Sequence, residues 1–275
     1  AGGARRRLLR RCHRDRRLNA AVQHLDAARA ILHAASQRPG ALCVLTGAGM
    51  SAESGIPTFR DALTGLWARF DPAELASEEG FRAHPQRVWD WYAERREGVR
   101  RAEPNAGHHA LAGYARRWPG QLVLVTQNVD DLHQRAGNAE AIRLHGDILA
   151  DRWLQACPRR TACPAADARP GRPPHCAECG NLLRPGVVWF GEELPPAALE
   201  AARRAAESCA AMLVVGTSGA VWPAAGLVGQ ARQRGAKVII VNPAPSEIDD
   251  EANIVMRGTA AQLLPRLLDA TDPGD

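Results

Sequence analysis

The sequence is poor in lysine, in aromatic residues and in long apolar stretches. Lys237 is the only lysine, and aromatic residues make up 5% of the 275 positions. No apolar run approaches the roughly 18 residues of a membrane-spanning helix, which excludes an integral membrane protein of that kind. No charged, apolar and cleavable leader pattern is seen, so we expect no secretion by that route. Glycine and proline follow no period, which excludes a collagen-like or low-complexity chain.

The positive charge is concentrated in one short segment. Hydrophobic residues make up 45% and charged residues 24%, as in globular proteins, and the length suits one large domain with a small insertion. The net charge is +5, but residues 1–18 hold eight arginines against Asp15 alone. We therefore expect residues 19–275 to bind no specific nucleic acid. The arm is either a solvated terminus, a weak contact site for nucleic acid or an anionic membrane surface, or an organellar presequence.

The seven cysteines are unevenly distributed, with four of them between positions 157 and 179. An odd, clustered set indicates a metal site in a reducing compartment rather than a disulfide scaffold. Together with the arginine-rich, alanine-rich usage of a GC-rich genome, this predicts a bacterial cytoplasmic protein. Cys12, Cys43 and Cys209 lie outside the cluster, and we expect them to be free thiols, the last two buried.

Apolar runs alternate with amphipathic stretches along the chain. We predict buried strands at 41–46, 121–126, 141–144, 211–216 and 236–241, and helices at 19–36, 85–101, 106–117, 223–234 and 260–268, leaving 251–259 unassigned. Near-continuous apolar strands separated by helices are typical of a parallel sheet that is covered on both faces. The predicted fold class is α/β: a Rossmann-like parallel sheet with helices on both faces, plus a small inserted zinc-binding module at about 150–185 that has no periodicity. A helical insertion is expected at about 55–105.

Small and polar residues follow the predicted strands, at the sheet edge where such folds bind ligands. The first strand continues into GAGMSAESGIPTFRD at 47–61, whose glycines let the backbone approach a phosphate. It lacks the third glycine and the prompt second strand of a dehydrogenase fingerprint, so that class is disfavoured. TQNVDDLHQRAG at 126–137, His145-Gly146, GTSGAVWPAA at 216–225 and Val241-Asn242-Pro243 follow the later strands. A histidine at a strand end is by itself more often structural than catalytic.

The motifs GAGMSAESGIPTFR, TQNVDDLH, LHG, LLRPGVVWFGE and GTS, in this order, resemble the sirtuin family of NAD-dependent protein-lysine deacylases. The resemblance runs from about residue 20 to 270. It implies that His145 and Asn128 are catalytic, with His145 as the general base, and that Asp130 holds the nicotinamide carboxamide. It further implies NAD contacts by Gly47, Ala48, Gly49, Ser51, Glu53, Ile56, Phe59, Arg60, Trp67, Gln127, Asn128, Asp130, Gly216, Thr217, Ser218, Asn242, Pro243 and Ala260.

The resemblance also implies the chemistry. Nicotinamide leaves the ribose, the acyl oxygen of a modified lysine captures C1′, and His145, whose ordinary pKa is near 6.5, accepts a proton from the attacking ribose hydroxyl. The products are free lysine, nicotinamide and O-acyl-ADP-ribose. The partners are acylated-lysine proteins or peptides, and the segment Val188, Trp189, Phe190 and Gly191 resembles the one that pairs with the substrate backbone.

Tyr92 and Arg95 are three positions apart on a predicted helix and therefore share one of its faces. A phenol beside a guanidinium suits a carboxylate, which arginine can bind bidentately. From the residues alone, a core tyrosine and a surface arginine are the simpler interpretation. Tyr-x-x-Arg, however, resembles the signature of sirtuins that remove succinyl, malonyl and glutaryl groups, and Ala76 matches the small residue that leaves room for them. Removal of acetyl groups is expected as well.

Cys176 and Cys179 form a C-x-x-C pair, which is a common half-site for tetrahedral Zn²⁺. The family usually supplies a second such pair about eight residues after the catalytic histidine, where this chain has Trp153. Cys157 and Cys163 are the available alternatives, so we predict a structural four-cysteine site. Replacement of one ligand by His175, or a degenerate module that holds little zinc, is left open.

Two other functions remain possible on the sequence. The same NAD site serves protein ADP-ribosyltransferases, and a catalytically inactive member would be a sensor of NAD or ADP-ribose. The presence of both His145 and Asn128 argues against an inactive site. A monomer is the default expectation.

Overall fold

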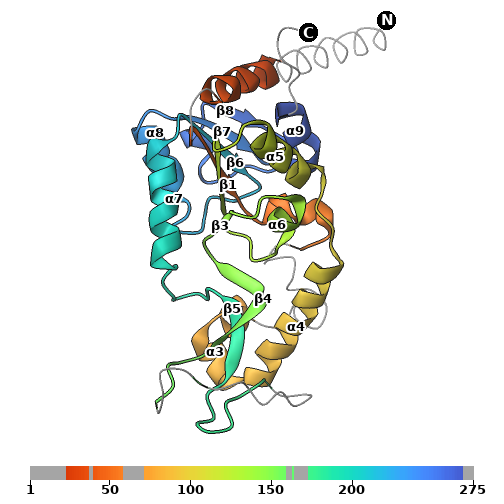
Figure 1. Ribbon diagram of the computed structural model, residues 1–275, viewed down its shortest axis with the longest axis vertical. Helices are drawn as coiled ribbons and strands as arrows, with labels where there is room; N and C mark the ends of the chain where they lie inside the picture. The colour runs from red at the N-terminus through yellow and green to blue at the C-terminus, as the bar shows by residue number, and fades with distance from the viewer. Residues whose placement is uncertain (1–22, 37–39, 58–70, 159–162, 164–172, 269–275) are drawn as a thin grey trace, which may run out of the picture.

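The computed structural model describes residues 23–36, 40–57, 71–158, 163 and 173–268. Its main element is a six-stranded parallel sheet in the order β3-β2-β1-β6-β7-β8 (Figure 1). The strands are β1 (Leu42–Thr46), β2 (Leu122–Thr126), β3 (Ile142–Arg143), β6 (Ala211–Val215), β7 (Lys237–Val241) and β8 (Ile254–Met256).

Apolar residues on both faces of each central strand explain why this sheet is buried. In β1, Leu42 and Val44 pack on one face, and Cys43 and Leu45 on the other. The first face is covered by the helix at 23–35, α5 (Ala106–Arg117) and α9 (Ala260–Leu268). The second is covered by α7 (Pro196–Ser208) and α8 (Gly226–Gln233). Helices on both faces of a parallel sheet confirm the predicted fold class.

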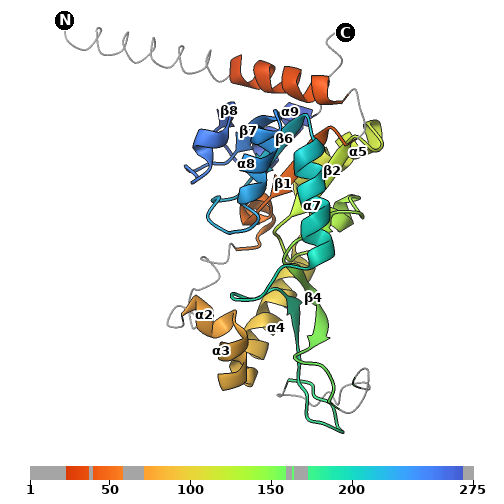
Figure 2. The same ribbon diagram turned by 90° about the vertical axis from the view of Figure 1, so that its left-hand side faces the viewer.

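A second, smaller lobe lies at the opposite end of the molecule from the helix at 23–35 (Figures 1 and 2). It contains the antiparallel pair β4 (Gly146–Trp153) and β5 (Leu183–Val187) and the helices α2 (Pro72–Leu75), α3 (Glu78–Ala83) and α4 (Pro85–Arg101). Arg96 ties α4 to β4, because its guanidinium donates to the carbonyls of Ile148 at 2.6 Å and Ala150 at 3.1 Å. The lobe has its own apolar core, which includes Phe81, Trp91 and Trp189.

The structure agrees with most predicted elements and corrects some of their bounds. Helices 85–101, 106–117 and 260–268 have the predicted limits. The prediction of a helix from 223 is wrong at its start, because 222–225 form turns and α8 begins at Gly226. The described part of the first helix is 23–35 rather than 19–36, and each predicted strand is shorter by one or two residues. The unassigned stretch 251–259 contains β8.

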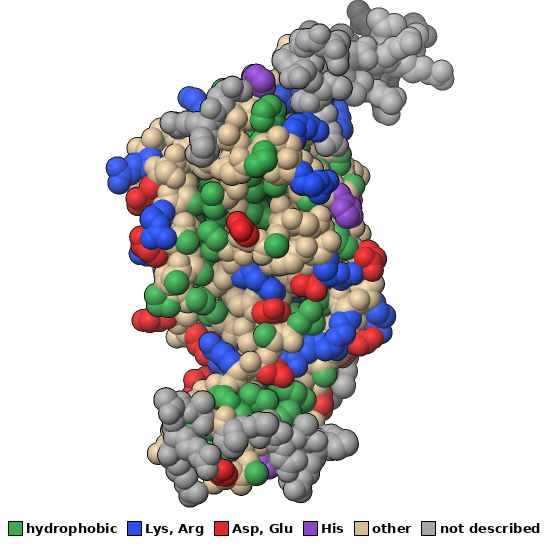
Figure 3. Space-filling model, in the orientation of Figure 1, with side chains coloured by type: hydrophobic (Ala, Val, Ile, Leu, Met, Phe, Trp, Pro, Cys, Tyr) green, Lys and Arg blue, Asp and Glu red, His purple; other side chains and the backbone are tan. Residues whose placement is uncertain are grey.

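Charged groups of both signs are interspersed on the face that Figure 3 displays. No helix of the described residues is long and apolar enough to cross a membrane. The remaining helical elements are the 3-10 turns η1 (Ala48–Met50), η2 (Ala52–Ser54) and η4 (Asp249–Glu251), and the short helix α6 (Leu132–Ala136).

Candidate active site

The loops after β1 and β6 meet at the carboxyl edge of the sheet, and at Gly49 and Gly216 they leave no room for a side chain. The Gly49 amide donates to the Gly216 carbonyl at 2.8 Å. A Cβ atom on Gly49 would lie 2.7 Å from the Gly216 Cα atom. Gly216 itself has a φ of 62°, a conformation that L side chains rarely adopt. The two glycines therefore let η1 approach the second loop closely and present backbone amides beside it.

A buried chain of hydrogen bonds joins η1 to the loop after β2. The Asn128 side-chain amide donates to the Ser51 hydroxyl at 3.1 Å, and this hydroxyl donates to the Asp130 carboxylate at 2.9 Å. The Leu132 amide donates to the other Asp130 oxygen at 3.1 Å. Burial raises the pKa of Asp130, and the hydrogen bonds from Leu132 and Ser51 oppose that rise. The predicted residues Ser51, Asn128 and Asp130 thus form one polar cluster.

His145 follows β3, and one of its ring nitrogens points to a backbone carbonyl. Its Nδ1 atom lies 2.9 Å from the Gln127 carbonyl oxygen. A carbonyl only accepts, so Nδ1 carries the proton and Nε2 is left as the basic nitrogen of the neutral ring. Burial lowers the pKa of His145, while the bond to the Gln127 carbonyl acts in the opposite direction. The arrangement is that of a neutral base.

The predicted adenosine-side residues also gather at the carboxyl ends of the strands. The Gln127 amide donates to the Thr217 hydroxyl at 3.3 Å, which connects the loops after β2 and β6. Asn242 follows β7 and donates to the Ala244 carbonyl at 2.8 Å. Ser218 and Pro243 are exposed next to them.

The Glu53 side chain makes a hydrogen bond to the backbone of the same protein. Its carboxylate accepts the Ala261 amide at 2.8 Å, at the first turn of α9, which begins at Ala260. An acid at a helix N-terminus is stabilised by the exposed amides there. This contact holds η2 and α9 together. Phe59, Arg60 and Trp67 lie outside the described residues.

Ala76, Tyr92 and Trp189 share the apolar core of the second lobe, against which Ile56 also packs. The Trp189 indole nitrogen donates to the Tyr92 hydroxyl at 3.0 Å. The Arg95 guanidinium carbon lies 4.7 Å from the centroid of the Trp91 ring. Burial lowers the pKa of Arg95, whereas the nearby Tyr92 and Asp130 raise it. Tyr92 and Arg95 are therefore neighbours on the side of α4 that faces Asp130.

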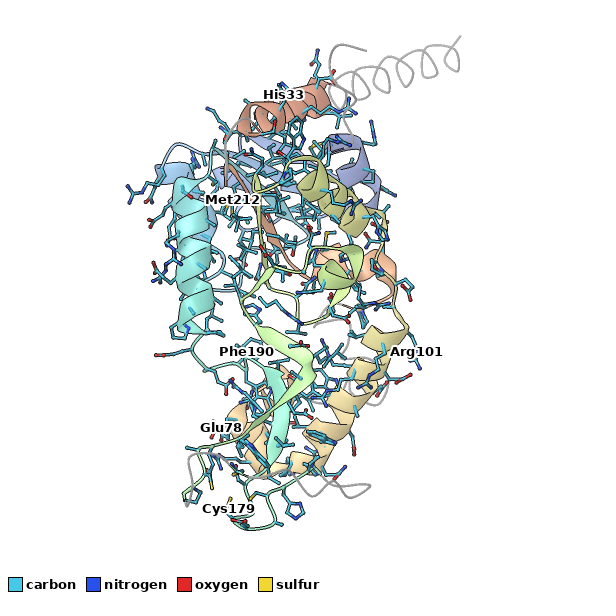
Figure 4. All side chains as sticks on the ribbon, in the orientation of Figure 1. His33, Glu78, Arg101, Cys179, Phe190 and Met212 are labelled. Carbon is cyan, nitrogen blue, oxygen red and sulfur yellow. The ribbon has the colours of Figure 1, made fainter. Side chains whose placement is uncertain are left out.

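The segment 188–191 leads from β5 along the border between the lobes, where Figure 4 labels Phe190. The Val188 amide donates to the His145 carbonyl at 2.9 Å, and the Phe190 amide donates to the Ala76 carbonyl at 2.9 Å. The Trp189 amide donates to Glu192 at 2.8 Å. Because these amides are occupied, a peptide that pairs with this segment must use its other backbone groups. Gly191 is exposed beside them.

Three of the four predicted zinc ligands form a cluster at the tip of the second lobe, near the Cys179 label in Figure 4. The sulfurs of Cys157, Cys163 and Cys179 lie within 4.8 Å of one another. The Sγ atoms of Cys163 and Cys179 are 3.6 Å apart. This distance is close to the roughly 3.8 Å between two sulfurs that bind one tetrahedral zinc ion. Cys176 is buried, and its thiol interacts with Cys163 and Cys179. The donor set fits a structural zinc ion, and His175 is absent from the cluster of described ligand atoms.

Three residues that support the site were not predicted. Arg143 donates to the carbonyls of Val129 at 2.8 Å and Asp130 at 3.0 Å and so fixes the backbone on either side of the carboxylate. Asn105 caps α5 and donates to the Met50 carbonyl at 2.8 Å. Asn181 donates to the Gln155 carbonyl at 2.7 Å between the two cysteine segments. Only Asn105, a preferred residue at a helix start, carries a signal in the sequence.

The fold and this edge define a class of protein: a Rossmann-like enzyme with a loop suited to phosphate, a buried amide–carboxylate cluster and a histidine base. The model of the Sir2 family matches residues 47–223, and the chain belongs to the Sir2 family, as its motifs predict.

The similarity to other proteins extends over most of the chain. An NAD-dependent protein deacylase of Ralstonia nicotianae is 56% identical over 241 residues, which cover 88% of this chain and 94% of that protein. The NAD-dependent protein deacylase 1 of Pseudomonas aeruginosa is 49% identical over 238 residues, which cover 85% and 95%. A Sir2 homolog–NAD complex has a TM-score of 0.74 at 45% identity, with 83% and 88% of the two chains covered. A Sir2–p53 peptide–NAD⁺ complex has a TM-score of 0.72 at 29% identity, with 86% and 96% covered.

Proposed function

We propose that this protein uses NAD to remove acyl groups from lysine side chains of proteins and that it prefers acyl groups ending in a carboxylate: succinyl, malonyl and glutaryl. Membership of the Sir2 family and relatives named NAD-dependent protein deacylases support the NAD-dependent deacylation. Removal of acetyl groups is a second expected activity. The products are nicotinamide, O-acyl-ADP-ribose and free lysine.

The residues of the sheet edge suit the handling of NAD as a co-substrate. Amides of the loop at 47–51 bind its phosphates, as helix-start and glycine-rich backbones do. The Asn128–Ser51–Asp130 chain binds and orients the nicotinamide end, where a carboxylate with a raised pKa can share a proton with a carboxamide. Thr217, Ser218, Asn242 and Pro243 surround the adenosine end.

His145 carries the proton transfer. As nicotinamide departs, the acyl oxygen of the lysine substrate bonds to C1′ of the ribose, and a ribose hydroxyl then attacks the acyl carbon. The lysine nitrogen leaves that carbon as the free amine, and one water molecule adds to give O-acyl-ADP-ribose. The Nε2 atom of His145 accepts the proton of that hydroxyl, because Nδ1 is occupied by the Gln127 carbonyl. No side chain needs to form a covalent bond with the substrate.

The acidic preference rests on one observation: the buried Tyr92 and the neighbouring Arg95 lie on the same side of α4, and Tyr92 shares an apolar core with the small residue Ala76. A carboxylate in such a place can accept from the guanidinium and from the phenol, and charge-assisted bonds of this kind are strong. A bulkier residue at 76 would fill the space that a malonyl, succinyl or glutaryl group needs. An acetyl group is too short to use either donor.

The test compares acetyl-lysine and succinyl-lysine forms of one peptide, with release of nicotinamide and of deacylated peptide both measured. We expect Arg95→Met to lower the succinyl-to-acetyl ratio of kcat/KM by roughly 100-fold. Arg100→Met is the matched control, because Arg100 is on the same helix with its side chain 57% exposed, and it should leave the ratio unchanged.

Two other results of this assay would contradict part or all of the proposal. Removal of acetyl alone by the unaltered protein would retain NAD-dependent deacylation and refute the acidic preference. Consumption of NAD without deacylation of either peptide would favour ADP-ribosyl transfer to protein.

A further inference from the structure

The hydrogen bond between Trp189 and Tyr92 has only one possible direction. An indole N–H is a donor and never an acceptor, so at 3.0 Å the Tyr92 oxygen must accept. Both side chains are buried, with Trp189 2% and Tyr92 4% exposed. Among the described residues, none accepts the proton of the Tyr92 hydroxyl in return. A lone pair of this hydroxyl is thus occupied by the protein, while its proton is available to a ligand.

The Tyr92 hydroxyl also keeps its proton at neutral pH. Burial raises the pKa of Tyr92 to about 12, although the nearby Arg95 guanidinium and the hydrogen bond from Trp189 act in the opposite direction. A neutral phenol beside a guanidinium can donate to an anion, whereas a phenolate would repel it. Tyr92 and Arg95 together therefore offer two donors to an anionic group.

The indole is held in place from several directions. The Arg184 guanidinium carbon lies 3.2 Å from the centroid of the Trp189 ring, and Arg184 is 1% exposed. Arg184 is paired with Glu192, whose carboxylate accepts the Trp189 backbone amide at 2.8 Å. The Phe81 ring centroid lies 5.3 Å from that of Trp189. Because ring and backbone are both fixed, the direction of the N–H bond is fixed as well.

We propose that Trp189 is a specificity-determining positioning residue: its indole N–H occupies the acceptor side of the Tyr92 hydroxyl and thereby directs the hydroxyl proton to the terminal carboxylate of an acidic acyl group. The inference rests on the proposed function. It assigns to Trp189 a role beyond its place in the substrate-pairing segment, and it concerns acidic acyl groups specifically, since an acetyl group has no second acceptor for this proton.

The test removes the N–H while the ring is retained. Trp189→Phe should lower the succinyl-to-acetyl ratio of kcat/KM by about 3- to 10-fold, and the change should lie in KM for the succinyl peptide with kcat little altered, because a carboxylate contact is made equally in ground state and transition state. Replacement of Trp189 by benzothienylalanine, a bicyclic isostere without the N–H, gives the same information if the phenylalanine variant does not fold.

A double-mutant cycle with Tyr92→Phe decides whether Trp189 acts through Tyr92. Tyr92→Phe alone should lower the ratio by roughly 10-fold, and the double variant should lower it no further. If the two substitutions lower the ratio independently, so that their effects multiply in the double variant, the inference is overturned. The same holds if kcat/KM falls equally for both peptides, because Trp189 would then serve packing alone. The unaltered protein separates the two hypotheses: if it does not accept succinyl-lysine, the proposed acidic preference fails and the inference with it. If it does and loss of the N–H leaves the ratio intact, only the inference fails.

Discussion

His145 has one ring nitrogen occupied by the protein and one available for chemistry. Burial lowers its pKa below the ordinary 6.5, and the bond from Nδ1 to the Gln127 carbonyl reduces this shift without cancelling it. The imidazolium form cannot accept a proton, so activity is lost as the pH falls through the pKa of the folded protein. Because that pKa is lowered, the neutral base persists to a lower pH than a free histidine would allow.

We therefore expect the acid limb of the kcat/KM profile for succinyl- or acetyl-lysine peptide to lie below pH 6.5. His109→Gln is the matched control, since His109 is exposed on α5, and it should leave the limb in place. His145→Gln should abolish the plateau. A limb at or above 6.5 in the unaltered protein would contradict the assignment of His145 as a buried neutral base.

Single residues also mark the limit of what the sequence reveals about the site. Ser51, Asn128, Asp130 and His145 were predictable because they lie in long, ordered motifs. Arg143 was not, because its role depends on the carbonyls of Val129 and Asp130, which fold back towards it from the end of the neighbouring strand. A residue that positions others by binding backbone carbonyls cannot be recognised from the sequence of its own segment.

Among the elements, the loop after β1 requires glycine where it approaches the loop after β6. A Cβ atom on Gly49 would meet backbone atoms of Gly216, which cannot rotate away. We expect Gly49→Ala to force the two loops apart, to weaken NAD binding at least about 10-fold and to lower the free energy of unfolding by about 1–3 kcal/mol. Titration with NAD and urea denaturation measure the two effects.

Gly98→Ala is the matched control for that substitution. Gly98 lies inside α4, and a Cβ atom at this position would meet nothing within 4 Å, so alanine should stabilise the protein by about 0.5–1 kcal/mol. It should leave NAD affinity unchanged. Equal behaviour of the two variants would show that close approach of the loops is unimportant.

Elements were predictable where apolar residues recur with a clear period. Large apolar residues recur on one face of α4 and α9, whereas the buried face of α5 has only two, Leu111 and Tyr114. Helix α7 was missed because its buried face is made of alanines: Ala202, Ala205 and Ala206. Strand β5 was missed because Pro185 and Gly186 contradict a strand pattern, and its partner β4 lies 30 or more residues away in the sequence.

At the scale of the whole molecule, the two strands of the second lobe connect the cysteine cluster to His145 and to the segment 188–191. β4 begins directly after His145, and β5 ends directly before the segment 188–191. A Cβ atom on Gly146 would lie 2.2 Å from the Gly186 carbonyl oxygen, so the strands are in close contact at this end. Cys179 lies at the far end of the lobe (Figure 4), and the six-stranded sheet that would bind NAD lies at the other end of β4 (Figure 1).

This arrangement predicts an unequal effect of zinc removal. We expect about one zinc per chain by metal analysis, and we expect Cys179→Ser to release it while His175→Ala retains it, because His175 is absent from the cluster of described ligand atoms. Loss of zinc should lower the melting temperature and the turnover of acyl peptide, because the module can no longer hold β4 and β5. NAD affinity should fall much less, since the predicted NAD contacts lie mainly at the sheet edge. Retention of zinc by Cys179→Ser, or an equal loss of NAD binding and turnover, would contradict a structural site that acts through these two strands.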